Sequence, residues 1–66
     1  MTYTAKQLTS AIQKVYPIMD KSTIEHNLVD GIFEGVNEMA WGRIESELKY
    51  ELPADKIAAI KTELTK

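Results

Sequence analysis

The sequence predicts an all-α protein, a small bundle of three or four short helices that forms a single helical domain over residues 1–66. Three observations favour this class. Apolar residues recur at helical spacing along most of the chain, two Ser/Thr-x-x-Gln/Glu capping boxes mark helix starts, and both prolines stand where a helix should end or begin. A chain of 66 residues buries only about 60% of the surface that its unfolded form exposes. Dimerisation could therefore complete the core.

The first helix should begin at about Ala5, because Thr4 and Gln7 form a capping box immediately before it. One helical face then carries Leu8, Ala11, Ile12, Val15, Tyr16 and Met19. Pro17 has no amide hydrogen and disfavours the helical conformation of the residue before it. The helix should therefore end near Val15.

A second capping box, Ser22 with Glu25, predicts another helix start. The apolar residues after it recur every four positions: Ile24, Leu28, Ile32, Val36, Ala40, Ile44 and Leu48. Because an α-helix has 3.6 residues per turn, this row drifts by about 40° per step, and one straight helix could not bury it against one neighbour. We expect a break or bend near Gly31–Gly35 that separates helices of about 22–30 and 33–50.

An alternative to this break is a β-hairpin. The dipeptide Asp30-Gly31 is flanked by the apolar pairs Leu28-Val29 and Ile32-Phe33, and an Asp-Gly between apolar residues is a strong hairpin signal. The flanks are short and lack clean alternation, so the helical interpretation is preferred.

The C-terminal part of the chain predicts a last helix. Pro53 suits its first turn, and one face then carries Ile57, Ile60 and Leu64. No internal repeat or low-complexity segment is evident anywhere in the chain.

Composition excludes several classes of protein. The chain has no cysteine and one histidine, so neither a disulfide framework nor an ordinary zinc site is expected. No apolar run approaches the roughly 20 residues that cross a bilayer, and the stretch MTYTAKQLTS lacks the basic segment and apolar core of a signal peptide. We expect a soluble cytoplasmic protein without a cofactor or metal and without a membrane contact.

The glycines suggest an interface. On one continuous helix, Gly31, Gly35, Gly42 and Ser46 would fall within an arc of about 60°. Each glycine costs about 1 kcal/mol relative to alanine, and close approach of another helix could restore that loss. The hypothesis is a helix–helix or dimer interface along this small-residue face, in a homo-oligomer. The alternative is that Gly31 simply ends a helix.

The centre of the chain is acidic. Residues 20–51 contain eight acidic and three basic residues, a local net charge of −5. On the same helical wheel the acidic side chains would cluster around the only tryptophan, in the set Asp30, Glu34, Glu38, Trp41 and Glu45. Such a face suits a partner with a basic surface. The alternative is an ordinary solvated face with Trp41 in the core.

No phosphate-binding glycine loop, reactive thiol or Ser-His-acid arrangement is present. His26 and Asp30 are i,i+4 neighbours, but two ligands are too few for a dedicated metal site. We therefore expect no enzyme activity, and predict a protein-binding module that acts as a regulator, adaptor or inhibitor. In general character it resembles the small acidic inhibitors and regulators of phages and other mobile elements.

The competing function is a dimeric DNA-binding regulator. The stretch Lys21 to Leu28 resembles the start of a recognition helix in helix-turn-helix regulators, where capping Ser and Thr residues precede an apolar anchor. The chain departs from that pattern at Pro17-Ile18, where a glycine is usual, and in carrying Glu25 and Asp30 without an arginine. Because phosphate contacts supply much of the affinity for DNA, this acidic helix makes nucleic-acid binding the less favoured interpretation.

Overall fold

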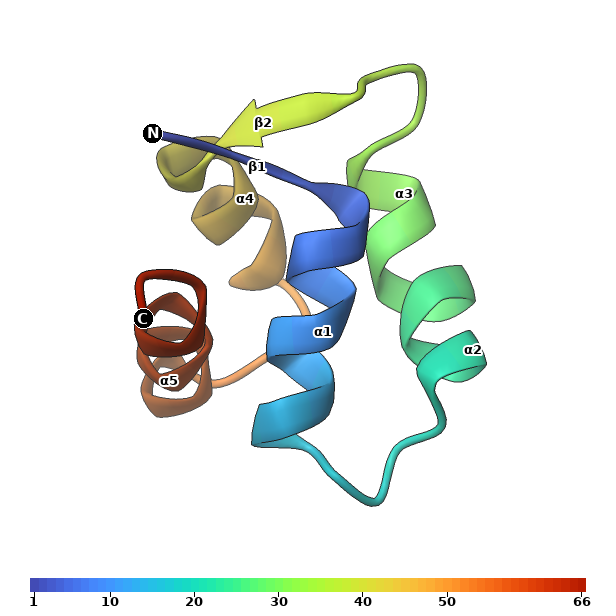
Figure 1. Cartoon of the computed structure of the whole chain (residues 1–66), viewed down its shortest axis with the longest axis vertical. Coiled ribbons are helices and arrows are strands. Elements are labelled where there is room, and N and C mark those ends of the chain that lie inside the picture. The colour runs from blue at the N-terminus through green and yellow to red at the C-terminus, as the bar shows by residue number, and fades with distance from the viewer.

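The computed structural model describes all residues 1–66 and is mainly helical, with a two-stranded sheet at one end (Figure 1). In chain order the elements are β1 (Thr2–Thr4), α1 (Ala5–Val15), α2 (Lys21–Ile24), the π-helical segment η1 (Glu25–Val29), α3 (Asp30–Ile32), β2 (Glu38–Ala40), α4 (Trp41–Leu48) and α5 (Ala54–Leu64). The predicted small helical fold is confirmed. The all-α class was too narrow, because β1 and β2 form an antiparallel pair.

Helix α1 has the bounds that its capping box predicts. The amide of Gln7 donates to Thr4 Oγ1 at 3.2 Å, and the amide of Thr4 donates to Gln7 Oε1 at 2.8 Å. These reciprocal bonds satisfy two amides that the first helical turn would otherwise leave unpaired. The helix ends at Val15, two residues before Pro17.

The second predicted capping box is wrong. Helix α2 begins at Lys21, one residue early, and Asp20 occupies the cap position without a side-chain hydrogen bond. Ser22 and Glu25 therefore lie inside the helical segment, where the serine hydroxyl no longer faces the orphan amides of the first turn.

We expect Thr4→Ala to lower the free energy of unfolding by about 1 kcal/mol, because it removes the hydroxyl that accepts a hydrogen bond from the Gln7 amide. Ser22→Ala is the matched control, and we expect a change of less than about 0.5 kcal/mol. Urea denaturation followed by circular dichroism measures both values. Equal losses in the two variants would contradict the assignment of the helix starts.

The segment α2–η1–α3 is one helical rod from Lys21 to Ile32, so the Asp30-Gly31 hairpin is excluded. The predicted break near Gly31–Gly35 is confirmed, because the rod ends at Ile32. The predicted helix 33–50 is wrong: residues 33–37 form a turn, and β2 precedes α4. Gly35 has a φ of 73°, a left-handed conformation that ends helices and that glycine adopts without a steric penalty.

Strand pairing explains why residues 38–40 leave the helical pattern. Tyr3 pairs with Met39 at the centre of the sheet, flanked by the pairs Thr2–Ala40 and Thr4–Glu38. Tyr3 and Met39 are buried, whereas Glu38 and Ala40 are exposed. This alternation has the period of two that a strand requires.

The core is one cluster to which every major helix contributes. Its members are Tyr3, Leu8, Ala11, Ile12, Ile24, Val29, Phe33, Met39, Ile44, Leu48, Ile57 and Ile60. The break divides the row of apolar residues that recur every four positions. Ile24 and Ile44 are buried, whereas Val36 and Ala40 are exposed. Because the helical rod ends at Ile32, the row does not have to stay on one face of a single helix.

Helix α5 confirms the predicted apolar face of the last helix. Pro53 is its cap residue, one position before the predicted first turn, and the helix runs from Ala54. Ile57 and Ile60 are buried and Leu64 is half-buried. The face packs along α1, in the most extensive helix–helix contact of the chain.

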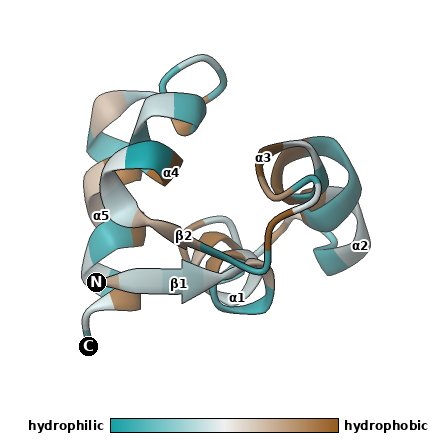
Figure 2. Ribbon diagram, turned by 90° about the horizontal axis from the view of Figure 1, so that it is seen from above, coloured by the Kyte–Doolittle hydropathy of each residue, from teal (hydrophilic) through white to brown (hydrophobic).

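The two halves of the chain repeat one pattern with an offset of 36 residues, which the sequence reading missed. Each half runs strand, helix, turn, helix, and the strand leads directly into its helix in both. The corresponding pairs include Tyr3/Met39, Leu8/Ile44, Ile12/Leu48, Pro17/Pro53 and Ile24/Ile60; apart from the exposed prolines, both members of each pair are buried. The register pairs Tyr3 with its own counterpart Met39, as a local two-fold axis requires. Seen from above, α2–α3 and α4–α5 lie on opposite sides of the strands and α1 (Figure 2).

Candidate functional site

The structure does not place the four small residues on one helical face. Gly31 lies in α3, Gly35 lies in the turn, and Gly42 and Ser46 lie in α4, beyond β2. The common face assumed a continuous helix, and that assumption is wrong because the helix ends at Ile32. A Cβ added at any of the three glycines would meet no atom within 4 Å, so no close helix contact inside the chain requires them. Their role in contact with a second copy stays a prediction.

The predicted acidic face is divided for the same reason. Asp30 in α3 accepts a hydrogen bond from His26 at 3.1 Å and lines a hollow against α1. Glu45 in α4 lines a different hollow, beside α5. Glu38 lies on β2, where Thr2 Oγ1 donates to its carboxylate at 2.7 Å. Glu34 is exposed in the turn between these elements. The four carboxylates therefore do not form one continuous helical face.

Trp41 is partly buried and packs against the core cluster. It is the first residue of α4 and directly follows β2. It corresponds to Ala5 at the start of α1, which is also partly buried. Contact with the core supports the alternative interpretation of Trp41 in part, and the remaining exposure leaves the proposed partner contact as a prediction.

A groove of about 260 Å³ lies between η1–α3 and the C-terminal end of α4. Leu28 and Ile32 line one wall, Leu48 and Tyr50 line the other, and Glu47 and Glu51 add two carboxylates. Leu28 and Ile32 are half-buried, and Leu48 is fully buried at the base. Asn27 and Gly31 complete the lining, so the groove combines apolar side chains with polar ones and carries two carboxylates.

The π-helical turn determines that Leu28 belongs to the groove. The amide of Asp30 donates to the carbonyl of Glu25, five residues back, so this turn holds one residue more than an α-helical turn. As a result Val29, not Leu28, follows Ile24 into the core. Leu28 turns towards α4 and remains half-buried there. Single π-turns of this kind occur frequently at functional sites.

The groove carries uncompensated charge and an exposed aromatic ring. The ion pairs of the chain are Lys14–Glu63, His26–Asp30 and Lys66–Glu63, so neither Glu47 nor Glu51 has a cationic partner within 4.0 Å. Glu47 in α4 and Glu51 in the turn after it are i,i+4 neighbours of like charge, an arrangement that costs about 0.2–0.5 kcal/mol on a helix. Tyr50, between them in the sequence, is 85% exposed. A cation placed against this rim would relieve the repulsion.

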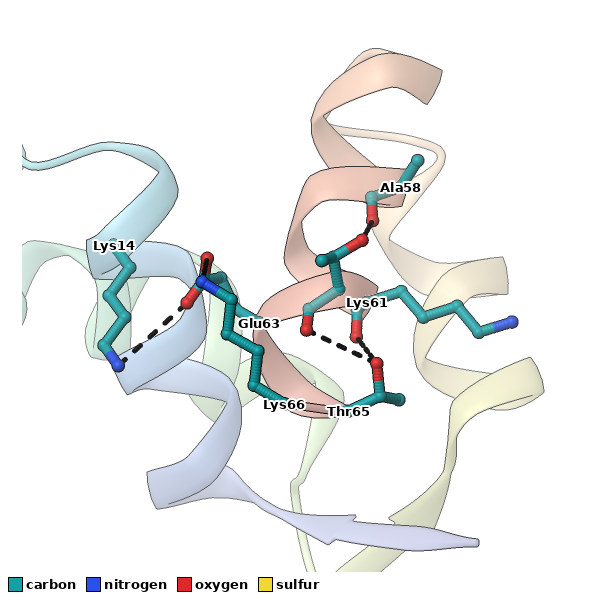
Figure 3. Close-up of polar contacts among 7 residues, drawn as sticks. Lys14, Ala58, Lys61, Glu63, Thr65 and Lys66 are labelled. Atoms are coloured by element: carbon teal, nitrogen blue, oxygen red, sulfur yellow. Dashed lines mark hydrogen bonds and ion pairs between the residues drawn. The ribbon is translucent and has the colours of Figure 1, made fainter.

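A second groove, between α1 and α5, is the counterpart of the first under the 36-residue repeat. It is lined by Ala11, Lys14, Glu63 and Leu64 among others, at positions that correspond to Glu47, Tyr50, Asn27 and Leu28. Here Lys14 Nζ lies 4.0 Å from Glu63 Oε1 and bridges α1 to α5 (Figure 3). Ala11 is only 4% exposed, whereas its counterpart Glu47 is exposed. An ion pair thus joins the two sides of the groove between α1 and α5, and no ion pair joins the two sides of the groove between α3 and α4.

Glu47 and Glu51 were predicted only as part of the acidic centre of the chain, and not as site residues. A helical wheel could not group them with Leu28 and Ile32, because the groove joins segments that a turn and a strand separate. The signal that could have found them is the repeat. Aligned with an offset of 36, small apolar Ala11 and apolar Val15 are replaced by the two glutamates.

No helix of the structure is long and apolar enough to cross a membrane, and no group of three or more His, Asp or Glu side chains is placed to hold a metal ion. Comparison with protein-family models, with curated proteins and with solved structures gave no match.

Proposed function

We propose that this chain is a non-enzymatic protein-binding module, a cytoplasmic regulator, adaptor or inhibitor that engages a basic partner through the acidic groove between α3 and α4. The observation that carries the proposal is the pair Glu47 and Glu51. They line a groove of mixed polar and apolar character and have no cationic partner within 4.0 Å. They stand where the other half of the chain has Ala11 and Val15.

The groove suits a partner segment that presents one long apolar side chain beside a lysine or arginine. The apolar side chain would pack against the half-buried Leu28 and Ile32, and the cation would lie against the two glutamates. Amphipathic helices commonly bind apolar grooves in this way, and complementary charge sets orientation and association rate. Tyr50 is placed to cover the partner, since exposed aromatic residues are enriched at binding hot spots.

A direct test uses a defined probe, a synthetic amphipathic helical peptide of leucine and lysine, titrated into the protein by calorimetry. We expect the double variant Glu47→Gln/Glu51→Gln to bind the peptide about tenfold more weakly, a loss of roughly 1.4 kcal/mol for two partly screened charges. The matched control is Asp20→Asn/Glu34→Gln, which removes the same net charge at exposed positions outside the groove.

Two outcomes would contradict the proposal. Equal weakening in both double variants would mean that the peptide responds only to net charge. Absence of binding by the wild-type chain would reject the groove as a docking site. For the natural partner, a photoreactive benzoylphenylalanine in place of Tyr50 should crosslink a protein in cell lysate, and the crosslink should disappear in the Glu47/Glu51 variant and persist in the control.

The alternative function, a DNA-binding regulator, is favoured by one observation. Helix α1, the connection at residues 16–20 and the rod from Lys21 follow one another as in a helix-turn-helix unit, with Ser22, Thr23 and Asn27 exposed on the second helix. Against it, His26 is paired with Asp30 on that same helix. Retention of the wild-type chain on a DNA column at about 50 mM salt, lost as salt rises, would favour this alternative.

A further inference from the structure

The main contacts of this chain join its first half, residues 1–32, to its second half, residues 38–66. Strand β1 pairs with β2, and α5 packs along α1. Within the second half, α4 and α5 contact each other far less extensively than α5 contacts α1. The second half therefore obtains most of its packing from the first, and a second copy of the chain offers an identical first half.

The segment between the halves can act as a hinge. Phe33 is buried and stays with the first half, but Glu34, Gly35, Val36 and Asn37 are exposed. One backbone hydrogen bond closes the turn, from the amide of Val36 to the carbonyl of Phe33 at 2.9 Å. Straightening the segment would break that bond and expose no additional core side chain.

We propose that the chain forms a dimer by exchanging residues 38–66 with a second copy, so that β2 and α5 of each chain pack on β1 and α1 of the other, and that the left-handed turn at Gly35 holds the unexchanged form. Exchange of identical elements recreates every contact except those of the hinge. The balance between the two forms is therefore set by the hinge and by protein concentration. This interface is independent of the acidic groove and of its partner.

Gly35→Val tests the hinge cleanly. A Cβ at this position would meet no atom within 4 Å, so the substitution acts through the φ of 73°, which a β-branched residue rarely adopts. We expect this variant to be mainly dimeric by size-exclusion chromatography with light scattering. Gly42→Val is the matched control: its Cβ also meets open space, its φ is not left-handed, and it should match the wild type.

A disulfide identifies the exchange itself, because the natural chain has no cysteine. Thr2 and Ala40 are paired across the sheet and both are exposed. When Thr2→Cys and Ala40→Cys chains, each also carrying Gly35→Val, are unfolded, mixed and refolded, we expect a disulfide that joins one chain of each kind.

Three outcomes would overturn the proposal. The first is a Gly35→Val chain that is folded by circular dichroism and monomeric at every concentration. The second is a dimer in which the two cysteine chains are not joined, since it would associate through its outer surface. If Gly35→Val does not fold, deletion of Gly35 and Val36 replaces it, because a shortened hinge prevents folding back; a folded monomer of that variant is the third contrary result.

Discussion

Replacing Ile60 with alanine should remove roughly half of the free energy of unfolding of the chain at 25 °C. Ile60 is fully buried in α5, and removal of three buried carbon atoms costs about 2–5 kcal/mol, depending on how far the site collapses. The free energy of unfolding of the whole domain is only about 3–10 kcal/mol, because native proteins have about 0.05–0.15 kcal/mol per residue. One substitution therefore removes a large part of the free energy of unfolding.

The repeat extends this expectation to a second position. Ile24 is the counterpart of Ile60 and is equally buried, so Ile24→Ala should be similarly destabilising, at about 2–5 kcal/mol. The matched control is Ile18→Ala, because Ile18 is 99% exposed in the connection after α1. Urea denaturation of the three variants gives the comparison. A loss at Ile18 as large as that at Ile60 would show that the described core is incorrect.

Replacing Met39 with lysine should cost at least about 3 kcal/mol, whereas replacing its neighbour Ala40 with lysine should cost less than about 0.5 kcal/mol. Met39 is buried opposite Tyr3 in the sheet, and a lysine there would bring an unpaired charge into the core. Ala40 is exposed, so its lysine would reach solvent.

This pair of variants also decides between two conformations of residues 33–40. In a continuous helix 33–50, Ala40 would belong to the apolar row between Val36 and Ile44, and the lysine at that position would be the damaging one. In the strand, Met39 is the sensitive position. Thermal unfolding followed by circular dichroism separates the two cases, and a larger loss for Ala40→Lys would reject the strand.

Local signals in the sequence predicted most of the helices. The Thr4–Gln7 capping box and Pro17 define both ends of α1, because the interactions that cap or terminate a helix lie within a few residues of its ends. Ile57 and Ile60 predicted the buried face of α5 in the same way. The break after Ile32 was also predictable, since a row repeating every four residues cannot remain on one face of a helix.

The strands and the groove depend on contacts between distant residues, and local patterns do not report these. Residues 38–40 form a strand because Met39 pairs with Tyr3, 36 positions away. The helical wheel that grouped Gly31 with Gly42, and Asp30 with Glu45, assumed one helix where the chain has two. The candidate site was therefore predicted only as an acidic region in the centre of the chain, without its pairing of Glu47 and Glu51 with Leu28.

Because both halves of the 36-residue repeat lie in one chain, residues on the two sides of the molecule can be substituted independently of each other. In a symmetric homodimer of identical half-length chains, every substitution appears twice, so both sides must present the same groove. A single chain that contains both halves is free of that constraint. Here Lys14 and Glu63 bridge one groove, while the other has Tyr50 and Asn27 at the corresponding positions and two unpaired glutamates beside them. Covalent linkage of the halves thus lets one side carry an ion pair between α1 and α5 while the corresponding positions on the other side change independently.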